Sequence, residues 1–589
     1  MRTDLWTRWG RAIDPEHVLP EHPRPQLARD SHLSLNGTWR YAITPAADPV
    51  PAHDDGEILV PFSPEAPLSG VGRQLQPDER LTYRRRVELP DGFAVPGGRV
   101  LLHLGAVDQT CTVWLDDVQV GANAGGYLPF TIDVTDALRP DAPRPGGSEL
   151  RIDVRDGSDG AGHASGKQRL HRGGIWYTAQ SGIWQTVWLE AVPATYVEGL
   201  DLVPLLDASC VEVTVHGTAG LDAQVTLDGV SSTVPVGIPT RLALSGVRPW
   251  TPSDPHLYDV EVRLGEDRVT SYVGMRSFGV GPDAHGVPRL LLNGEPFFPV
   301  GVLDQGYWPD GLLTAPSDAA MVHDIETMKS LGFTLLRKHI KVEPLRWYHH
   351  CDRLGMLVWQ DFVNGGGRYR TAAVTWPGRR FAGPLRRLSD QRWAAHLGRG
   401  AGRELFEDEW RRTVALLRNV PSLAGWVPFN EGWGQFDAAR IASEVRAVDP
   451  TRVIDHASGW HDQGAGDLQS LHVYGRTFRL PRRRDGRAVV LSEYGGHDLR
   501  VEGHVFDDQA DFGYVHEDSP AALAASFTEL HEDLARLVPR GLSGTVYTQL
   551  SDVEDELNGL LTYDREVLKI DATVVRNALQ RLRIPSDPA

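Results

Sequence analysis

The strongest constraint on the fold is a change in the spacing of apolar residues near residue 288. From about Leu33 to Ser277, short segments such as residues 111–115 and 149–154 alternate apolar with polar side chains, and turn residues separate them. A period of two is typical of strands with one buried face. Regularly spaced short strands without a convincing amphipathic helix predict β-sandwiches for this part of the chain.

After residue 288, helical stripes alternate with short apolar runs. The expected strands are residues 297–302, 333–336, 356–359, 424–429, 453–456, 470–474, 489–492 and 544–549. The expected helices are residues 317–332, 345–354, 404–418, 438–448, 521–537 and 572–582. Eight strands alternating with helices predict a (β/α)8 barrel. The main irregularity, a Gly- and Arg-rich excursion over residues 363–403, is predicted to be a substrate lid.

Length and charge narrow the class of protein further. A chain of 589 residues is too long for one core and favours three or four domains. The net charge of −18 argues against non-specific nucleic-acid binding, because a polyanion is repelled. No window reaches the roughly 20 apolar residues of a membrane span. Three widely spaced cysteines and an N-terminus without an apolar h-region predict a cytoplasmic protein.

Two glutamates follow predicted barrel strands. Glu431 ends the run Gly-Trp-Val-Pro-Phe-Asn-Glu at residues 425–431, and Glu493 ends Val-Val-Leu-Ser-Glu at residues 489–493. Barrel enzymes place catalytic groups at the C-terminal ends of strands. These would be the fourth and seventh strands, which stand across the mouth of the barrel. A single such glutamate is usually a solvated loop charge, whereas two at these strands suggest a facing pair.

A facing pair of carboxyl groups is what a retaining glycosidase requires. At roughly 5–5.5 Å separation, one carboxylic acid protonates the leaving oxygen while the other attacks the anomeric carbon. The environments of the two groups must give them different pKa values. The sequence therefore predicts glycoside hydrolysis, with Glu431 as general acid/base and Glu493 as nucleophile.

Motifs over nearly the whole chain resemble glycoside hydrolase family 2. Leu-Asn-Gly-Thr-Trp at residues 35–39 and Ser-Gly-Ile-Trp-Gln-Thr-Val-Trp-Leu at 181–189 resemble the opening and close of its jelly-roll domain. Gly-Met-Arg-Ser-Phe at 274–278 resembles the passage from its immunoglobulin-like domain into the barrel. Asn-Glu at 430–431 and Ser-Glu-Tyr-Gly at 492–495 resemble its acid/base and nucleophile motifs.

The resemblance implies a multidomain architecture of β and α/β domains. Residues 1–193 would form a jelly-roll β-sandwich, residues 194–283 an immunoglobulin-like β-sandwich, and residues 284–589 the catalytic (β/α)8 TIM barrel. The loop of residues 156–174 in the first domain is long enough to reach the barrel mouth and close an exo-type pocket from one side.

The resemblance also implies roles for other residues. Asn430 would bond the sugar 2-hydroxyl, Tyr474 would orient the nucleophile, and Arg337 would keep Glu493 ionised. The remaining residues expected to bind the sugar, by hydrogen bonds or by stacking, are His339, Gln360, Asp361, Trp433, Trp460, His472 and Gln549. For these residues a purely structural role is an equal alternative, and for Gln549 it is the favoured one.

The sugar is predicted to be neutral. The eighth-strand loop lacks the Asn-x-Lys by which the family's glucuronidases bind a uronate carboxylate. Family frequencies favour a β-galactoside narrowly, while Trp-Gln-Asp-Phe at residues 359–362 resembles the mannosidase and glucosaminidase type. A galactofuranosidase or arabinofuranosidase remains an alternative, since the catalytic pair is indifferent to ring size. If uronides are preferred, Arg368 and Arg370 are the first candidates to bind the carboxylate.

Neither a metal nor a cofactor is expected. The acidic run of residues 552–556 is interpreted as a solvated loop without the spacing of a calcium site. Three alternatives stay open: a carbohydrate-binding protein with an inert barrel, a transglycosylase, and an endo-acting enzyme. The expected partner is a glycoside or oligosaccharide, and the sequence leaves open whether the chain forms a homo-oligomer.

Overall fold

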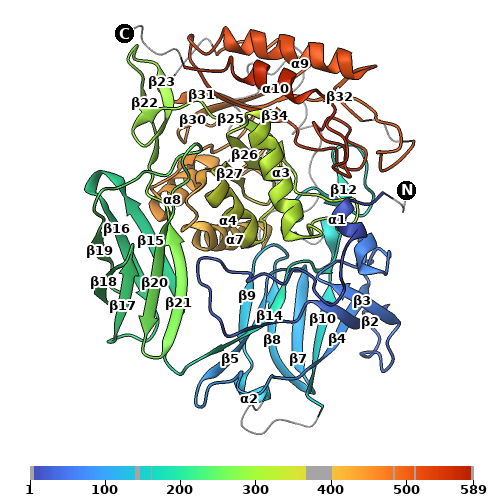
Figure 1. Cartoon of the computed structure of the whole chain (residues 1–589). Coiled ribbons are helices and arrows are strands. Elements are labelled where there is room, and N and C mark those ends of the chain that lie inside the picture. The colour runs from blue at the N-terminus through green and yellow to red at the C-terminus, as the bar shows by residue number, and fades with distance from the viewer. Residues whose placement is uncertain are drawn as a thin grey trace.

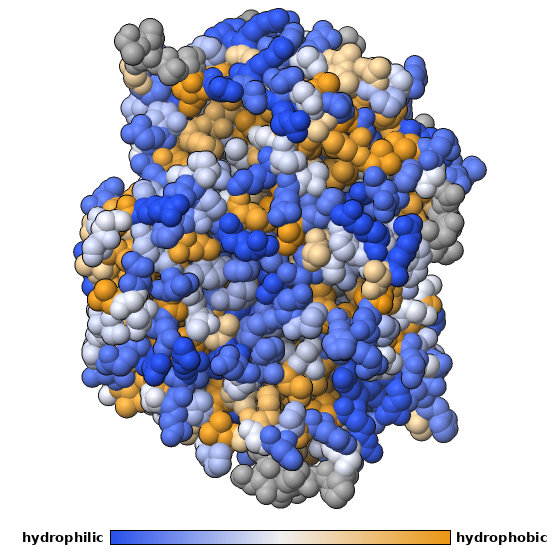
Figure 2. All heavy atoms as spheres, viewed as in Figure 1, coloured by the Kyte–Doolittle hydropathy of each residue, from blue (hydrophilic) through white to orange (hydrophobic). Residues whose placement is uncertain are grey.

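A computed structural model describes residues 5–138, 146–160, 162–365, 390, 401–475, 477–481, 485–509 and 512–584. The chain forms two β-sandwiches and a parallel barrel, with the first sandwich below the barrel and the second beside it in Figure 1. Hydrophilic side chains dominate the face seen in Figure 2, and hydrophobic ones form small separate groups. None of the helices in these ranges is both long and apolar enough to cross a membrane.

The first sandwich consists of a six-stranded and a four-stranded sheet. In spatial order the larger sheet contains β3 (Gly56–Val60), β2 (Gly37–Pro45), β4 (Glu79–Val87), β10 (Ser148–Arg155), β7 (Thr110–Leu115) and β8 (Val118–Ala124). The smaller sheet contains β1 (His32–Ser34), β14 (Val187–Val192), β5 (Arg99–Leu104) and β9 (Phe130–Asp133). Apolar and polar side chains alternate along the strands, so each strand buries one face. In β10, Leu150, Ile152 and Val154 are buried against the other sheet.

Short elements complete the first sandwich. They are α1 (Arg8–Arg11), α2 (Thr135–Leu138), β6 (Val107–Asp108), β11 (Gln168–Arg169), β12 (Tyr177–Thr178) and β13 (Gly182–Ile183). The two helices have four residues each, too few to form an amphipathic face that a periodicity search would detect.

The second sandwich packs a three-stranded sheet on a four-stranded one. The smaller sheet contains β15 (Gly199–Leu205), β16 (Cys210–His216) and β19 (Thr240–Ala243). The larger contains β18 (Val230–Pro235), β17 (Asp222–Leu227), β20 (Tyr258–Leu264) and β21 (Asp267–Val273). A hairpin of β22 (Phe278–Pro282), β23 (Pro288–Leu292) and β24 (Glu295–Pro296) then leads into the barrel.

The eight expected barrel strands all form, and they pair in parallel. They are β25 (Val300–Asp304), β26 (Leu335–Lys338), β27 (Leu357–Asp361), β28 (Leu423–Val427), β29 (Val453–Ile454), β30 (Leu468–Tyr474), β31 (Ala488–Gly495) and β34 (Leu542–Thr548). The sheet order runs from β29 through β28, β27, β26, β25, β34 and β31 to β30, a nearly closed barrel. One buried cluster takes residues from all eight strands, including Leu303, Leu335 and Val490, so it fills the interior.

The first strand begins later than the predicted residue 297. Pro299 has no amide hydrogen to donate to a ladder, and the Phe297 amide donates to Leu290 of the preceding hairpin. Phe297 therefore belongs to the connection, and the barrel strand starts at Val300.

The expected helices form with boundaries shifted by at most three residues. They are α3 (Asp318–Leu331), α4 (Leu345–Leu354), α7 (Ala401–Leu417), α8 (Ala438–Val448), α9 (Pro520–Ala535) and α10 (Ala572–Leu579). Local capping sets the limits of α3: the Ser317 hydroxyl accepts from the Ala320 amide, and Gly332 ends the helix in the left-handed conformation. A two-residue ladder of β32 (His497–Asp498) and β33 (Val515–His516) lies beyond β31.

The first sandwich docks onto the barrel through an apolar cluster and a polar loop. Tyr127, Tyr177 and Trp184 pack with Tyr307 and Tyr563 of the barrel.

The excursion expected as a lid, with Arg368 and Arg370, lies outside the described residues except for 363–365, 390 and 401–403.

Candidate functional site

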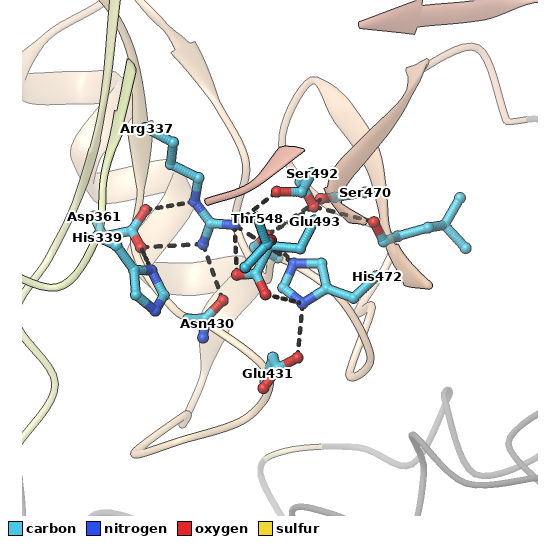
Figure 3. Close-up of polar contacts among 12 residues, drawn as sticks. Arg337, His339, Asp361, Asn430, Glu431, Ser470, His472, Ser492, Glu493 and Thr548 are labelled. Atoms are coloured by element: carbon cyan, nitrogen blue, oxygen red, sulfur yellow. Dashed lines mark hydrogen bonds and ion pairs between the residues drawn. The ribbon is translucent and has the colours of Figure 1, made fainter. Parts of the chain in front are cut away.

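Most polar residues of the predicted site gather where the parallel strands end (Figure 3). Glu493 lies within β31, while Glu431 follows β28 by four residues. An oxygen of each glutamate and Nδ1 or Nε2 of His472 all lie within 4.8 Å of one another. The two strands that the sequence places across the barrel mouth therefore bring their carboxyl groups together.

A tight turn presents Glu431 to the barrel mouth. Its backbone is left-handed, with φ of 51°, a conformation costing an L-residue roughly 1–2 kcal/mol. The Glu431 amide donates to the Ser458 carbonyl at 2.8 Å, which fixes the turn. The next residue, Gly432, has φ of 79°, and a Cβ there would lie 2.4 Å from His461. Such strain is characteristic of functional positions.

A strand irregularity orients Glu493. The register of β31 with β30 and with β34 shifts next to Glu493, as a β-bulge does when it redirects a side chain. Its Oε1 accepts from Arg337 at 3.0 Å, and its Oε2 accepts from the Tyr474 hydroxyl at 2.6 Å. Both contacts are the ones that the resemblance implies for Arg337 and Tyr474.

Arg337 is the fixed centre of the cluster. It is fully buried and makes a bidentate ion pair with Asp361, at 2.9 and 3.0 Å. Its remaining donors reach Glu493 and the side-chain oxygen of Asn430, the latter at 2.9 Å. His339 Nδ1 lies 2.7 Å from Asp361. Bidentate pairing fixes the guanidinium plane, so Arg337 sets the positions of residues on several strands.

His472 lies between the two glutamates. Its Nδ1 is 2.8 Å from Glu431 Oε1 and 3.3 Å from Glu493 Oε2. Its Nε2 is 2.8 Å from the Ser458 hydroxyl, which donates to Ser492. The sequence suggested a sugar contact for His472, but the ring is buried and both nitrogens are occupied by protein groups.

Burial raises the pKa of both glutamates. The pKa of Glu431 rises to about 7, against the opposing effects of Lys167, a Trp433 hydrogen bond and Arg337. Burial also raises the pKa of Glu493, although His472, Arg337 and the Tyr474 hydroxyl act in the opposite direction. Glu493 alone has an arginine in contact, which favours its ionised form over that of Glu431.

A pocket of about 420 Å³ opens onto both glutamates. Six predicted residues line it: His339, Asn430, Glu431, Trp433, Tyr474 and Glu493. A second cavity of about 1030 Å³ lies between the first sandwich, the N-terminal segment and α4, and its wall is mostly apolar. Neither glutamate belongs to that second cavity, so the chemistry belongs to the smaller pocket.

Several residues predicted to contact a sugar do not line the pocket. Gln360 is fully buried, accepting from the Tyr348 hydroxyl and donating to the carbonyls of Lys341 and Asp361. Gln549 is buried and donates to Asn558. Trp460 is likewise absent from the lining and has its ring edge-on to His472. The position of each side chain depends on packing that strand periodicity does not reveal.

The pocket also contains residues that the sequence analysis did not select, among them Lys167, Trp176, Gln305, Tyr514 and Glu556. Lys167 belongs to the loop of residues 156–174 that was predicted to close the pocket, and membership of this loop is the signal by which the sequence could have identified it. Glu556 belongs to the acidic run, whose interpretation as a solvated loop is wrong. Asp552 and Glu554 of that run are also buried, and the Glu554 carboxylate accepts from the Thr178 amide of the first sandwich.

Glu431, His472 and Glu493 also satisfy the geometric condition for a shared cation, because their donor atoms converge within 4.8 Å. The sequence analysis found no metal-ligand set. The same atoms are engaged in the hydrogen bonds described above, and the Arg337 guanidinium already supplies positive charge to Glu493.

Two family models match the chain. The model described as "Glycosyl hydrolases family 2" covers residues 204–276, and "Glycosyl hydrolases family 2, TIM barrel domain" covers residues 289–479. Among curated proteins, the chain is similar to β-galactosidases from Klebsiella pneumoniae (strain 342), at 26% identity over 76% of the chain, and Enterobacter cloacae, at 24% over 78%. It spans less than half the length of each relative, 46%.

Solved structures share the fold along nearly the whole chain. A family 2 β-galacturonidase from Eisenbergiella tayi bound to galacturonate has a TM-score of 0.70 at 17% identity, covering 96% of this chain and 99% of its own. A β-D-glucuronidase from Dictyoglomus thermophilum has a TM-score of 0.72 at 16% identity, covering 95% and 98%. With the two family models and the curated relatives, the chain belongs to glycoside hydrolase family 2.

Proposed function

We propose that the protein is a retaining exo-glycosidase that cleaves a terminal β-linked sugar. The observation that carries this proposal is the approach of a Glu431 oxygen to within 4.8 Å of a Glu493 oxygen. Retaining enzymes place their carboxyl groups about 5–5.5 Å apart, whereas inverting enzymes need about 6.5–9.5 Å to admit water between them.

The two glutamates have different roles in this mechanism. Glu431, with a pKa of about 7, is protonated in a large fraction of molecules at neutral pH and donates its proton to the leaving oxygen. Glu493 attacks the anomeric carbon, forming a glycosyl-enzyme ester. Glu431, now ionised, removes a proton from water, which attacks the same carbon and releases Glu493. Asn430 would bond the 2-hydroxyl with the amide nitrogen that its contact to Arg337 leaves available.

The exo mode is supported by the first sandwich. Lys167, Ile175 and Trp176 line the pocket together with barrel residues, so the sandwich limits how far a sugar chain can extend.

We also propose that the first domain ends at residue 193 and the second at residue 283. Three buried, unpaired cysteines support a reducing, cytoplasmic compartment.

We propose a neutral sugar, with a β-galactoside favoured. Glu493 and Glu556 both line the pocket, which would repel a uronate, and curated relatives are named β-galactosidases. Lys167 favours a second candidate, a β-uronide, and solved structures of similar fold are named β-galacturonidase and β-glucuronidase. Rates on nitrophenyl β-galactopyranoside, β-galactofuranoside, β-mannopyranoside and β-glucuronide distinguish these candidates. Product analysis at high acceptor concentration separates hydrolysis from transglycosylation.

Azide rescue tests the assigned roles. Glu493→Ala should lose turnover on every substrate, and azide should restore it with the inverted α-glycosyl azide as product. Glu431→Ala should keep turnover on activated aryl glycosides, and azide should give the retained β-product. Exchanged outcomes would overturn the assignment, and two inactive variants that azide does not rescue would contradict the retaining mechanism.

A further inference from the structure

Lys167 reaches the barrel pocket from another domain. It precedes β11 in the first sandwich, and its carbonyl accepts from the Tyr177 amide at 2.9 Å. The amides of Ser165 and Gly166 donate to the Asn364 carbonyl of the barrel, at 3.1 and 3.0 Å. Hydrogen bonds to both domains therefore fix the backbone that carries Lys167.

Lys167 lines the pocket, and no carboxylate of the described residues pairs with its ammonium. Within the described part of the chain, its Nζ makes no ion pair under 4.0 Å, and it lies 5.5 Å from the centre of the Tyr177 ring. An ammonium has three donors and is strongly hydrated in water. A half-buried ammonium at the wall of a pocket can therefore donate to a ligand that displaces its water.

Glu556 supplies an acceptor at the wall of the same pocket. Its Oε2 accepts from the Tyr177 hydroxyl at 2.5 Å, and its Oε1 accepts from Asn558 at 3.0 Å. The side chain is buried but lines the pocket. A carboxylate has about four acceptor positions, so these two contacts fix its orientation and leave others available.

Tyr177 connects the two groups. Lys167 Nζ lies 5.5 Å from the centre of its ring, and its hydroxyl donates to Glu556, so the donor from the first sandwich and the acceptor from the barrel both approach Tyr177 at the wall of one pocket. Neighbouring hydroxyl groups of a sugar act as donors and acceptors in the same way.

We propose that Lys167 and Glu556 together bind hydroxyl groups of the terminal sugar, with Lys167 donating and Glu556 accepting, and thereby determine which neutral sugar the pocket accepts. This inference rests on the proposed glycosidase function. A uronate carboxylate at the same position would gain Lys167 but meet the negative charge of Glu556, so the pair favours hydroxyl groups over an acid.

The test compares Lys167→Met, Glu556→Gln and the control Arg155→Met in the full chain. Arg155 is an exposed cation of the same sandwich, on β10, outside the pocket. Calorimetry measures binding of D-galactose, D-mannose, L-arabinose and D-galacturonate, and kinetics measure kcat/KM on nitrophenyl glycosides. Thermal unfolding checks each fold, and Lys167→Met remains informative if Glu556→Gln does not fold, because Lys167 is only half-buried.

Loss of a hydrogen bond to a charged group should weaken binding of the preferred neutral sugar and lower kcat/KM by roughly 10- to 100-fold in each pocket variant. Arg155→Met should match the wild type. Three results would each overturn the inference. Lys167→Met could keep the wild-type affinity and kcat/KM, or the wild type could bind none of the neutral sugars. The wild type could also bind galacturonate more tightly than any neutral sugar, with Lys167→Met abolishing that binding. Sugar binding by the wild type without turnover of any glycoside would instead contradict the proposed catalytic function.

Discussion

His472 Nδ1 lies 2.8 Å from Glu431 Oε1 and at the same time 3.3 Å from Glu493 Oε2. A single imidazole therefore contacts both proposed catalytic carboxyl groups. Its Nε2 contacts Ser458, which connects to Ser492. The ring is therefore held on both sides, and it acts on the glutamates both by fixing their positions and by lowering the pKa of Glu493.

His472→Phe should lower kcat/KM by roughly 100-fold or more, since the variant loses a contact to the acid and to the nucleophile. His472 lowers the pKa of Glu493, so the acidic limb of the pH profile should move to higher pH. The matched control is His216→Phe on the exposed face of the second sandwich. An unchanged pH profile with reduced activity would indicate that His472 only supports the fold.

The pH dependence of kcat/KM follows from Glu431. Its pKa of about 7 lies above the usual 4.5, and the acid must be protonated to donate. Activity should therefore fall about tenfold per pH unit above roughly pH 7. A profile of kcat/KM from pH 4 to 10 on a substrate with a poor leaving group checks this. An alkaline limb below pH 5.5 would show that Glu431 is not the acid.

The same raised pKa affects stability. Folded Glu431 binds its proton more tightly than the unfolded chain does, so the proton-linked stabilisation is complete below about pH 4.5 and is lost as pH rises through about 7. Glu431→Gln removes this dependence and should be more stable than the wild type at pH 8, by at most about 3 kcal/mol. Thermal unfolding at pH 4.5 and 8 measures it. An equal difference at both pH values would contradict the shift.

Arg172 anchors the loop that carries Lys167 to the barrel. It pairs with Asp507 at 2.8 Å and with Asp555, and both partners belong to the barrel. Arg172→Met should release this contact and raise KM by about tenfold with a smaller change in kcat, since a displaced loop weakens sugar binding before it affects the glutamates. Steady-state kinetics beside Arg155→Met test this. A fall in kcat alone would contradict it.

Chelation tests whether the convergent set of Glu431, His472 and Glu493 holds a cation. We expect activity to stay within about twofold after treatment with a chelator, an effect under roughly 0.5 kcal/mol in the barrier, because these atoms already have protein partners. A large loss that magnesium or another divalent ion restores would establish a metal site here.

The sequence determined the architecture and the location of the acid pair. Alternation with period two, helical stripes and capping residues such as Ser317 and Gly332 are local signals, so they identify strands, helices and their ends. Because parallel strands all end on one face of a barrel, placing Glu431 and Glu493 at strand ends was enough to predict that they meet. The short turn and the bulge that orient their side chains were not visible in the pattern.

Only the tertiary structure decided which other side chains form the pocket. Gln360 points into the packing beside Tyr348, while Lys167 and Glu556 enter the wall from separate domains. The acidic run that resembles a solvated loop is buried because the first sandwich supplies Tyr177 and Thr178 as its hydrogen-bond donors. Such contacts join residues that are hundreds of positions apart in the sequence. They form when whole domains dock, and docking produces no periodic pattern in the sequence of either segment.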